Sequence, residues 1–237
     1  MSELKSKLKR VSGYKDTDFY KADSIGVICR GSSAHRLDLC YKKFNHCYLC
    51  GEFNKTLYKI ENYLQRKDIV LCLMQQFRYR TSEQNCRRFG IKNMQVRFQE
   101  GTEDHRRCIE KFPDLKVVGY VKKHYEITSM VNRGRENRDR SIYSTGLSGI
   151  ISALYFNPKD IYVIGMDFYD RTVKPYFVRE DMDIPHAEQI SISIKGLRDG
   201  MLESIRNICD LFPDTNLHLF TTYRGIMPQK NLHIRYV

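Results

Sequence analysis

The chain lacks any long apolar run. No window of its 237 residues approaches the roughly 18 consecutive apolar residues that a membrane-spanning helix needs. The first residues, MSELKSKLKR, carry charges with no apolar core behind them, so the sequence shows no secretory signal. We therefore expect a cytoplasmic protein without a transmembrane segment, unless an anchor has been trimmed from the chain. Any contact with a membrane would be peripheral.

The chain also lacks the paired ligands of a zinc site. It has eight cysteines, of which only Cys47 and Cys50 form a close pair, beside His46. A zinc site needs a second pair at a suitable spacing, and the sequence has none. Because Cys47-x-x-Cys50 falls in an apolar, strand-like run, we expect buried structural thiols and no metal site.

Acidic residues are few relative to basic ones. Lys and Arg total 40 against 28 Asp and Glu, a formal net charge of +12. This excess favours an anionic partner, whether nucleic acid, a nucleotide, a phosphate or an acidic membrane. It equally fits a surface that only keeps the protein soluble. The sequence has no internal repeat, and its length and hydrophobic fraction of 41% predict one globular domain over residues 1–237.

Short apolar runs alternate along the chain with helix-like segments. The runs that indicate buried strands are 25–29, 46–50, 69–73, 116–121, 161–165 and 217–220. Helical patterns cover about 54–66, 106–112, 147–156 and 190–212, whereas 78–107 is basic and shows no clear element. This alternation predicts an α/β fold, with a Rossmann-like, mainly parallel sheet and helices on both faces.

Two turns rich in small residues stand where a predicted strand meets a predicted helix. Arg30, Gly31 and Ser32 follow the first strand, and Ser144-Thr145-Gly146 can cap the helix over 147–156. Backbone N–H groups at a helix start attract anions, although an ordinary strand-to-helix turn has the same sequence pattern. We expect both turns at the carboxyl edge of the sheet, where open α/β sheets bind ligands.

Two further segments are predicted to be loops. Residues 122–140 carry six basic side chains, which could deliver cations to a phosphate or could simply be solvated. Residues 170–185 are polar and end at His186, and loops of this length in a compact domain are often lids. We therefore expect a mobile lid over 170–186.

The order of these motifs resembles that of the sialyltransferases, in both their animal and bacterial branches, over roughly residues 25–220. The strongest part is the stretch from Ser144 to Tyr169, STGLSGIISALYFNPKDIYVIGMDFY. The animal enzymes have Ser-Thr-Gly or Ser-Ser-Gly opening a helix, then a strand ending in Gly-Phe. The bacterial enzymes have Gly-Ile-Asp-Phe-Tyr where this chain has 165–169. Tyr176, His186 and the IKGL at 194–197 fall at or near further motif positions of the family.

The resemblance implies a glycosyltransferase that moves a sugar from a CMP-sugar donor to the hydroxyl of a glycan acceptor, without a metal or other cofactor. Tyr169 and Tyr176 would stabilise the charge that grows on the departing phosphate. His186 would take the proton of the acceptor hydroxyl. Ser144, Thr145 and Gly146 would contact the donor. No Asp-x-Asp cluster stands at a strand end to hold a metal.

The chain departs from the family at two donor-binding positions. Arg30 stands where the family has the asparagine of its first motif, and Gly51 replaces a second asparagine at the end of strand two. Each lost amide removes hydrogen bonds worth roughly 0.5–1.5 kcal/mol. Arg30 could compensate as a phosphate ligand. Two other hypotheses stay open: a transferase with a different nucleotide donor, and an inactive or repurposed relative that binds nucleic acid or another anionic partner.

Overall fold

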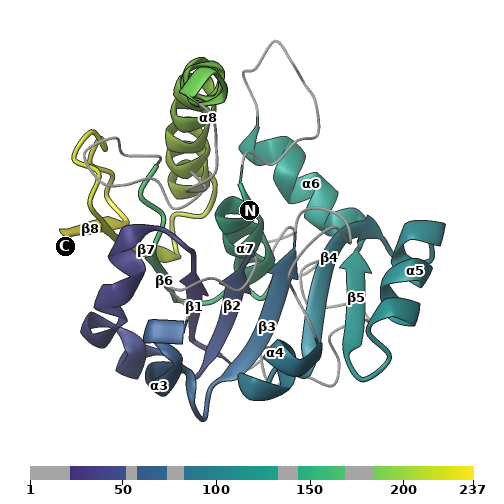
Figure 1. The fold of residues 1–237 in the computed structure, drawn as a ribbon. Helices are drawn as coiled ribbons and strands as arrows, with labels where there is room; N and C mark the ends of the chain where they lie inside the picture. Colours follow the sequence, from purple (N-terminus) through teal and green to yellow (C-terminus); the bar gives the residue numbers. More distant parts are fainter. Residues whose placement is uncertain (1–21, 52–57, 74–82, 133–143, 169–183) are drawn as a thin grey trace.

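The computed structural model describes residues 22–51, 58–73, 83–132, 144–168 and 184–237. These residues form one sheet of eight strands in the order β5-β4-β3-β2-β1-β6-β7-β8, and every neighbouring pair is parallel (Figure 1). The strands are β1 Ser24–Ile28, β2 His46–Cys50, β3 Asp68–Leu73, β4 Asn93–Gln99, β5 Lys116–Tyr120, β6 Asp160–Ile164, β7 Asn216–Thr221 and β8 Leu232–Tyr236. The predicted Rossmann-like α/β fold is confirmed.

The strand order reverses between β1 and β6. From β1 the chain steps outward to β5, then crosses back to pair β6 with the other side of β1, from Ser24↔Asp160 to Ile28↔Ile164. The connections that leave the two central strands therefore run in opposite directions, and open α/β sheets bind their ligands at the carboxyl ends of such strands. This reversal is the topological switch point of the sheet.

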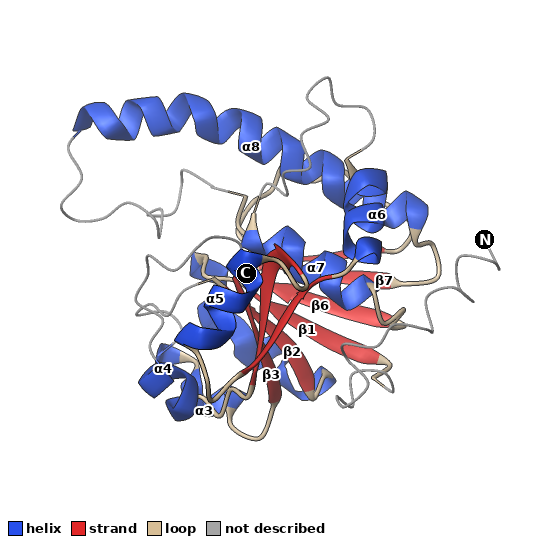
Figure 2. Ribbon diagram, turned by 90° about the vertical axis from the view of Figure 1, so that its right-hand side faces the viewer, coloured by secondary structure: helices blue, strands red, loops and turns tan. Residues whose placement is uncertain are grey.

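The two faces of the sheet carry different helices (Figures 1 and 2). The first half of the chain contributes η3 Ser32–Leu39, η4 Tyr41–Lys43, α3 Glu61–Leu64, α4 Glu83–Arg88 and α5 Glu103–Lys111, and the second half contributes α6 Lys122–Val131, α7 Thr145–Leu154 and α8 Ile184–Leu211. Right-handed crossovers place the two sets on opposite faces. Each set covers its own apolar cluster, with Leu37 and Cys108 in one and Ile127 and Ile208 in the other.

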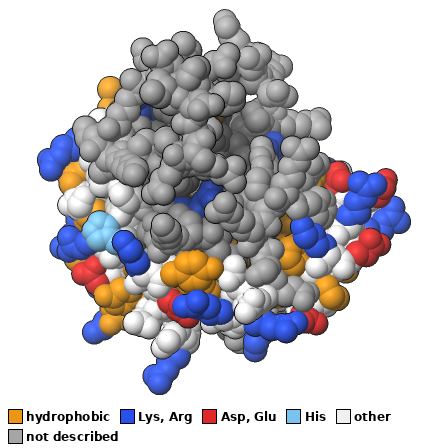
Figure 3. Space-filling view, in the orientation of Figure 1, with side chains coloured by type: hydrophobic (Ala, Val, Ile, Leu, Met, Phe, Trp, Pro, Cys, Tyr) orange, Lys and Arg blue, Asp and Glu red, His pale blue; other side chains and the backbone are white. Residues whose placement is uncertain are grey.

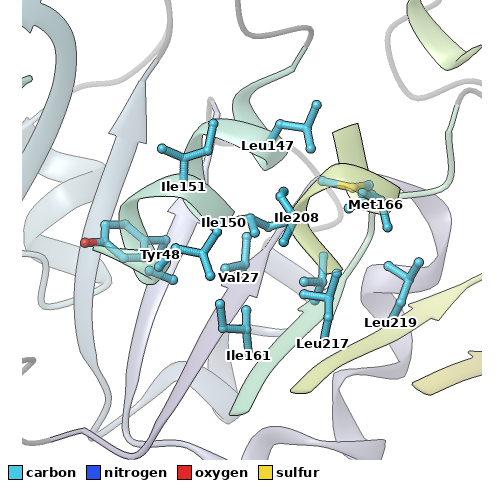
Figure 4. Close-up of a cluster of buried hydrophobic side chains, with 14 of the residues drawn as sticks. Val27, Tyr48, Leu147, Ile150, Ile151, Ile161, Met166, Ile208, Leu217 and Leu219 are labelled. Carbon is cyan, nitrogen blue, oxygen red and sulfur yellow. The ribbon is translucent and has the colours of Figure 1, made fainter. Parts of the chain in front are cut away.

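The central helix of the second face is α7, which is buried from Gly146 to Leu154. Its apolar side chains pack against Val27, Tyr48 and Ile161 of three neighbouring strands (Figure 4). Glycine lets the helix approach the sheet, since a Cβ on Gly149 would lie 2.5 Å from Sγ of Cys50. The small residues of the STGLSGIISAL stretch thus allow the whole of α7 to pack inside the core.

Two predictions about local structure are wrong, and strand β8 was not predicted. Residues 78–107, expected to be irregular, contain α4, β4 and the start of α5, and the predicted loop over 122–140 begins with α6. Strand β4 has the polar sequence NMQVRFQ, whose Gln95 is buried against a histidine rather than solvated. Strand β8 has one apolar face and one polar face because it is the edge of the sheet. Both strands therefore lack the continuous apolar run of a buried parallel strand.

The prediction of buried thiols is confirmed, because all eight cysteines are free and buried. Burial raises the pKa of the Cys47 thiol to about 12, so this thiol is not a reactive thiolate at neutral pH. Among the residues that the structure describes, no group of side chains is arranged to hold a metal ion. No helix in the same part of the chain is long and apolar enough to cross a membrane.

A buried histidine links α6 to the sheet. The His124 ring is stacked between Tyr120, with ring centroids 4.6 Å apart, and Tyr155, at 4.9 Å. Its Nδ1 accepts from the Val121 N–H at 3.3 Å, and its Nε2 lies 3.0 Å from the side-chain nitrogen of Gln95. Burial lowers the pKa of His124 from 6.5 to about 3. The folded protein therefore holds this ring neutral.

We expect His124 to make the protein less stable in acid. Below its unfolded pKa of 6.5, the unfolded state binds a proton that the folded state refuses until about pH 3. The free energy of unfolding therefore falls as the pH falls from 6.5 toward 3, by at most about 1.4 kcal/mol per pH unit. Replacing His124 by Phe keeps a stacked ring without the titration and should flatten this slope, measured by urea unfolding between these pH values.

Thr128→Val is the matched control for this experiment. The Thr128 hydroxyl donates to the His124 carbonyl at 2.7 Å and does not titrate, so its loss should lower stability equally at every pH. If the free energy of unfolding depends on pH equally in the wild type and in His124→Phe, another group causes the loss of stability in acid.

Candidate functional site

The loops that leave β1 and β6 are joined at the switch point. We call residues 29–33 and 165–168 the clasp. The Gly31 N–H donates to the Gly165 carbonyl at 2.8 Å, and the Gly165 N–H donates to Oγ of Ser33 at 3.0 Å. A Cβ on Gly31 would lie 2.4 Å from the Gly165 oxygen, and Gly165 has a φ of +78°. Only glycine fits either position, so the sequence of both turns is dictated by their contact.

The carboxylate of Asp167 holds the clasp closed. Its Oδ2 accepts from the Ser33 N–H at 2.9 Å and from Oγ of Ser32 at 3.0 Å. Its Oδ1 accepts from Oγ of Ser33 at 2.5 Å and from the Thr222 N–H at 3.2 Å, which ties in the end of β7. Asp167 is only 7% exposed, so these donors replace the water that an ionised carboxylate requires. Its role is to position the turn that carries Gly31 and Ser32.

The amino-terminal end of α7 lies beside the clasp. Ser144 caps the helix, because its Oγ accepts from the Leu147 N–H at 3.2 Å. A Cβ on Gly146 would lie 2.6 Å from Sγ of Cys29 and 2.5 Å from Cε of Met166, both in the clasp. The first N–H groups of a helix have no acceptor within the helix and carry the positive end of its dipole. The structure therefore brings Ser144, Thr145 and Gly146 to the same edge as Gly31 and Ser32.

The two positions that depart from the sialyltransferase pattern lie against each other. Gly51 ends β2 with a φ of +90°, and a Cβ there would lie 2.7 Å from Nε of Arg30. The Arg30 side chain is half-buried and extends from the end of β1 across Gly51. The glycine gives the guanidinium its space, so the residues at these two positions are physically coupled.

The three predicted catalytic residues are not brought together by the described part of the chain. Tyr169 and Tyr176 lie outside the described residues, although Tyr169 directly follows Phe168 of the clasp. His186 lies in the first turn of α8, and its side chain is not described. The helix starts at Ile184 rather than near 190, since Pro185 is well tolerated in a first turn. Figure 2 shows this end of α8 extending beyond the sheet. The catalytic roles and the lid over 170–186 stay predictions.

Sequence reasoning missed one cation at this edge. Arg198, on α8, lies over the Tyr223 ring at 5.5 Å, and the Tyr223 ring lies 5.7 Å from that of Phe168 in the clasp. The guanidinium is thereby fixed beside the carboxyl ends of β6 and β7. Its only sequence signal was its position directly after the IKGL motif.

The remaining positive charge is spread over the surface. Figure 3 shows Lys and Arg side chains around the rim of the view, with residues outside the described ranges over its centre. Lys122, in the first turn of α6, has a side chain 92% exposed. Arg133, Arg135, Arg138 and Arg140 lie outside the described residues. The expected delivery of cations from residues 122–140 stays a prediction.

Fold and site together define a doubly wound α/β protein in which the clasp and the first turn of α7 meet at the switch point, with Arg30 and Arg198 nearby. One fold of this class serves many chemistries. No protein-family model, curated protein sequence or solved structure matches this chain.

We expect Asp167→Asn to destabilise the protein by about 2–4 kcal/mol, because an amide nitrogen would face donors that now share a carboxylate. Urea unfolding at neutral pH measures the change. Asp114→Asn is the control: Asp114 forms an exposed ion pair with Arg87 at 2.7 Å, and its loss should cost less than about 1 kcal/mol. Similar losses for both variants would contradict the structural role of Asp167.

Proposed function

We propose that the protein is a glycosyltransferase of the sialyltransferase type that takes a sugar from a CMP-sugar and transfers it to an acceptor hydroxyl. The observation that supports this most is the meeting of the clasp and the start of α7 at one switch point. Both belong to the motifs on which the resemblance rests, and nothing in the sequence alone required them to touch.

The switch point suits the phosphate of a nucleotide. The N–H groups of Thr145 and Gly146 belong to the first turn of α7, whose dipole favours an anion there. Arg30 adds a guanidinium from the β1 side, and Arg198 adds one from the β7 side. A guanidinium binds phosphate through paired N–H donors, so Arg30 can replace the neutral amides that the family places here.

The proposed chemistry needs one acid and one base. The acceptor oxygen attacks the anomeric carbon, the bond from that carbon to the phosphate oxygen breaks, and the nucleotide leaves with the electron pair. Phenol groups of Tyr169 and Tyr176 donate hydrogen bonds to the departing phosphate. His186 takes the proton of the acceptor hydroxyl. In this proposal the side chains of the chain itself supply the stabilisation that a divalent metal supplies in other transferases.

The Arg30–Gly51 contact also supports a second candidate, a relative that binds a nucleotide or other anion without transferring a sugar. The added charge favours a ligand with more negative charge than a nucleoside monophosphate ester. A nucleoside diphosphate or a nucleic acid end would have that charge. The donor is therefore tested with more than one nucleotide.

We expect nucleotide binding at the switch point in isothermal titration calorimetry with CMP, CDP, UMP and UDP. A ligand at a hundredfold excess over its Kd should stabilise the protein by about 2.7 kcal/mol, which thermal unfolding also detects. Arg30→Ala should weaken binding at least about fivefold, the loss of one charge-assisted hydrogen bond. The control is Arg107→Ala, because Arg107 is exposed on α5 and pairs with Glu103.

Two results would contradict this proposal. If no nucleotide binds at millimolar concentration, the proposal of a nucleotide-sugar transferase is rejected. Binding that Arg30→Ala leaves unchanged would place the nucleotide away from the β1 turn.

We expect His186→Ala to reduce sugar transfer by about 10²–10⁴-fold while sparing nucleotide affinity, because the base acts on the acceptor proton. Tyr169→Phe should also slow transfer, by about 10²–10³-fold, since the phenol stabilises charge that grows in the transition state. Radiolabelled or fluorescent acceptors measure the rate. His46→Gln and Tyr58→Phe are matched controls, since His46 pairs with Asp68 at the opposite edge and Tyr58 contacts Asn85. Full activity of His186→Ala would reject this base.

A further inference from the structure

One part of the sheet has no helix over it in the described residues. The helices of the first half of the chain cover the first face from β1 to β5, with η3 reaching β6. After β5, every described helix lies on the other face, with Ile127, Leu147 and Ile208 in its core. This follows from the handedness of the crossovers, since the chain reverses direction at the switch point. On this face Ile164 and Phe220 are buried in the cluster that η3 covers. We therefore call only the part of β6, β7 and β8 at the level of Tyr162, His218 and His233 the open half-face.

A row of stacked rings crosses the open half-face. Tyr162, His218 and His233 stand in register on β6, β7 and β8, and we call them the ring row. The Tyr162 and His218 ring centroids lie 4.4 Å apart with planes 7° from parallel, and the His218 and His233 centroids lie 4.8 Å apart. At its inner end Phe44 lies 6.1 Å from Tyr162. Parallel strands in register thus set rings at stacking distance.

The ring row is fixed in orientation by polar contacts. Nε2 of His218 lies 2.7 Å from Oδ1 of Asp160, which also accepts from Nδ2 of Asn216 at 3.2 Å. The inner end of the row is covered, since Phe44 is 3% exposed, whereas Tyr162 and His218 are half-buried and His233 is exposed. The row therefore ends in an exposed imidazole on the edge strand, stacked on His218.

Cations border the ring row. Arg235 is exposed two residues beyond His233 on the same side of β8, and Lys42 and Lys43 are exposed on η4. Lys67 lies beside the inner end of the row, where its ammonium donates to the carbonyls of Tyr41 at 2.6 Å and Phe44 at 2.5 Å. The one described acid in contact with the row, Asp160, is engaged by His218 and Asn216. The half-face thus combines stacked rings with positive charge.

We propose that the open half-face binds single-stranded nucleic acid. A base stacks on the outer face of His233 and extends the ring row, and the neighbouring phosphates contact Arg235 and the lysines of η4. Every base has a π face, so stacking platforms next to cations bind single strands with little sequence preference. This surface lies on the side of the sheet opposite α7, and its occupant does not depend on the transferase chemistry proposed above.

Other partners fit this surface less well. A lipid surface or an obligate protein partner needs a wide apolar patch, and the exposed groups here are imidazoles, a phenol and cations. A second copy of the chain paired through β8 would bring the Arg235 side chains of two edges to one seam, where like charges repel. A single strand matches both the rings and the charge.

We expect the full chain to bind labelled oligo(dT) and oligo(rU) of about 12 nucleotides more tightly than a duplex of equal length. Fluorescence anisotropy near 50 mM salt, an order-of-magnitude choice that favours phosphate contacts, measures both affinities. His233→Ala should weaken it about tenfold, the usual effect of losing one stacked base, and His233→Phe should restore it. Arg235→Ala should weaken binding and reduce the slope of log K against log[salt] by about 0.7, the value for one phosphate of a single strand.

Arg107→Ala is the control, because it removes an equally exposed charge far along the sheet on α5 and should leave the oligonucleotide affinity unchanged. Circular dichroism and thermal unfolding establish that each variant is folded. The proposal is overturned if the wild type binds no single strand at low salt, or if His233→Ala binds as well as the wild type. It is also overturned if His233→Ala only changes a dimer seen by light scattering.

Discussion

The architecture depends on one buried carboxylate. Asp167 accepts hydrogen bonds from the turn after β1 and from the end of β7, so it joins three adjacent strands at the edge where the sheet reverses. A charge this deeply buried is tolerable only because its donors are fixed in place. These hydrogen bonds fix the conformation of the turn at Gly31 and Ser32, and α7 can therefore start directly beside that turn. The edge that we propose as a nucleotide site is shaped by this network.

The handedness of the crossovers has two consequences for function. It places the start of α7 at the switch point, and it leaves the part of the first face around Tyr162, His218 and His233 without a described helix over it. The first is the edge where the clasp, the start of α7 and two arginines lie together. The second is a row of rings flanked by cations. A protein with a net charge of +12 could thus bind a nucleotide at one surface and a polynucleotide at the other.

The contact between Arg30 and Gly51 changes the meaning of the two departures from the sialyltransferase pattern. Considered separately, they suggested two lost hydrogen bonds and a weakened donor site. In the structure the glycine at φ +90° accommodates the arginine, so the two departures form one contact. In the proposed nucleotide site, this contact would offer a cation where the family has neutral amides. The sequence could not show this because the two residues are 21 positions apart.

The sequence by itself determined the fold class and six of the eight strands, because buried parallel strands need continuous apolar runs that composition reveals directly. It also placed Gly31 at the turn after the first strand and Ser144–Gly146 at a helix start, but α6 stands between β5 and that helix start, so the second turn does not follow a strand directly. Tertiary structure alone decided the rest. Polar β4 is a strand because Gln95 finds His124, and β8 is a strand because an edge needs only one apolar face. The roles of Asp167, Arg198 and the ring row depend on contacts between strands far apart in the chain, and no local pattern encodes such contacts.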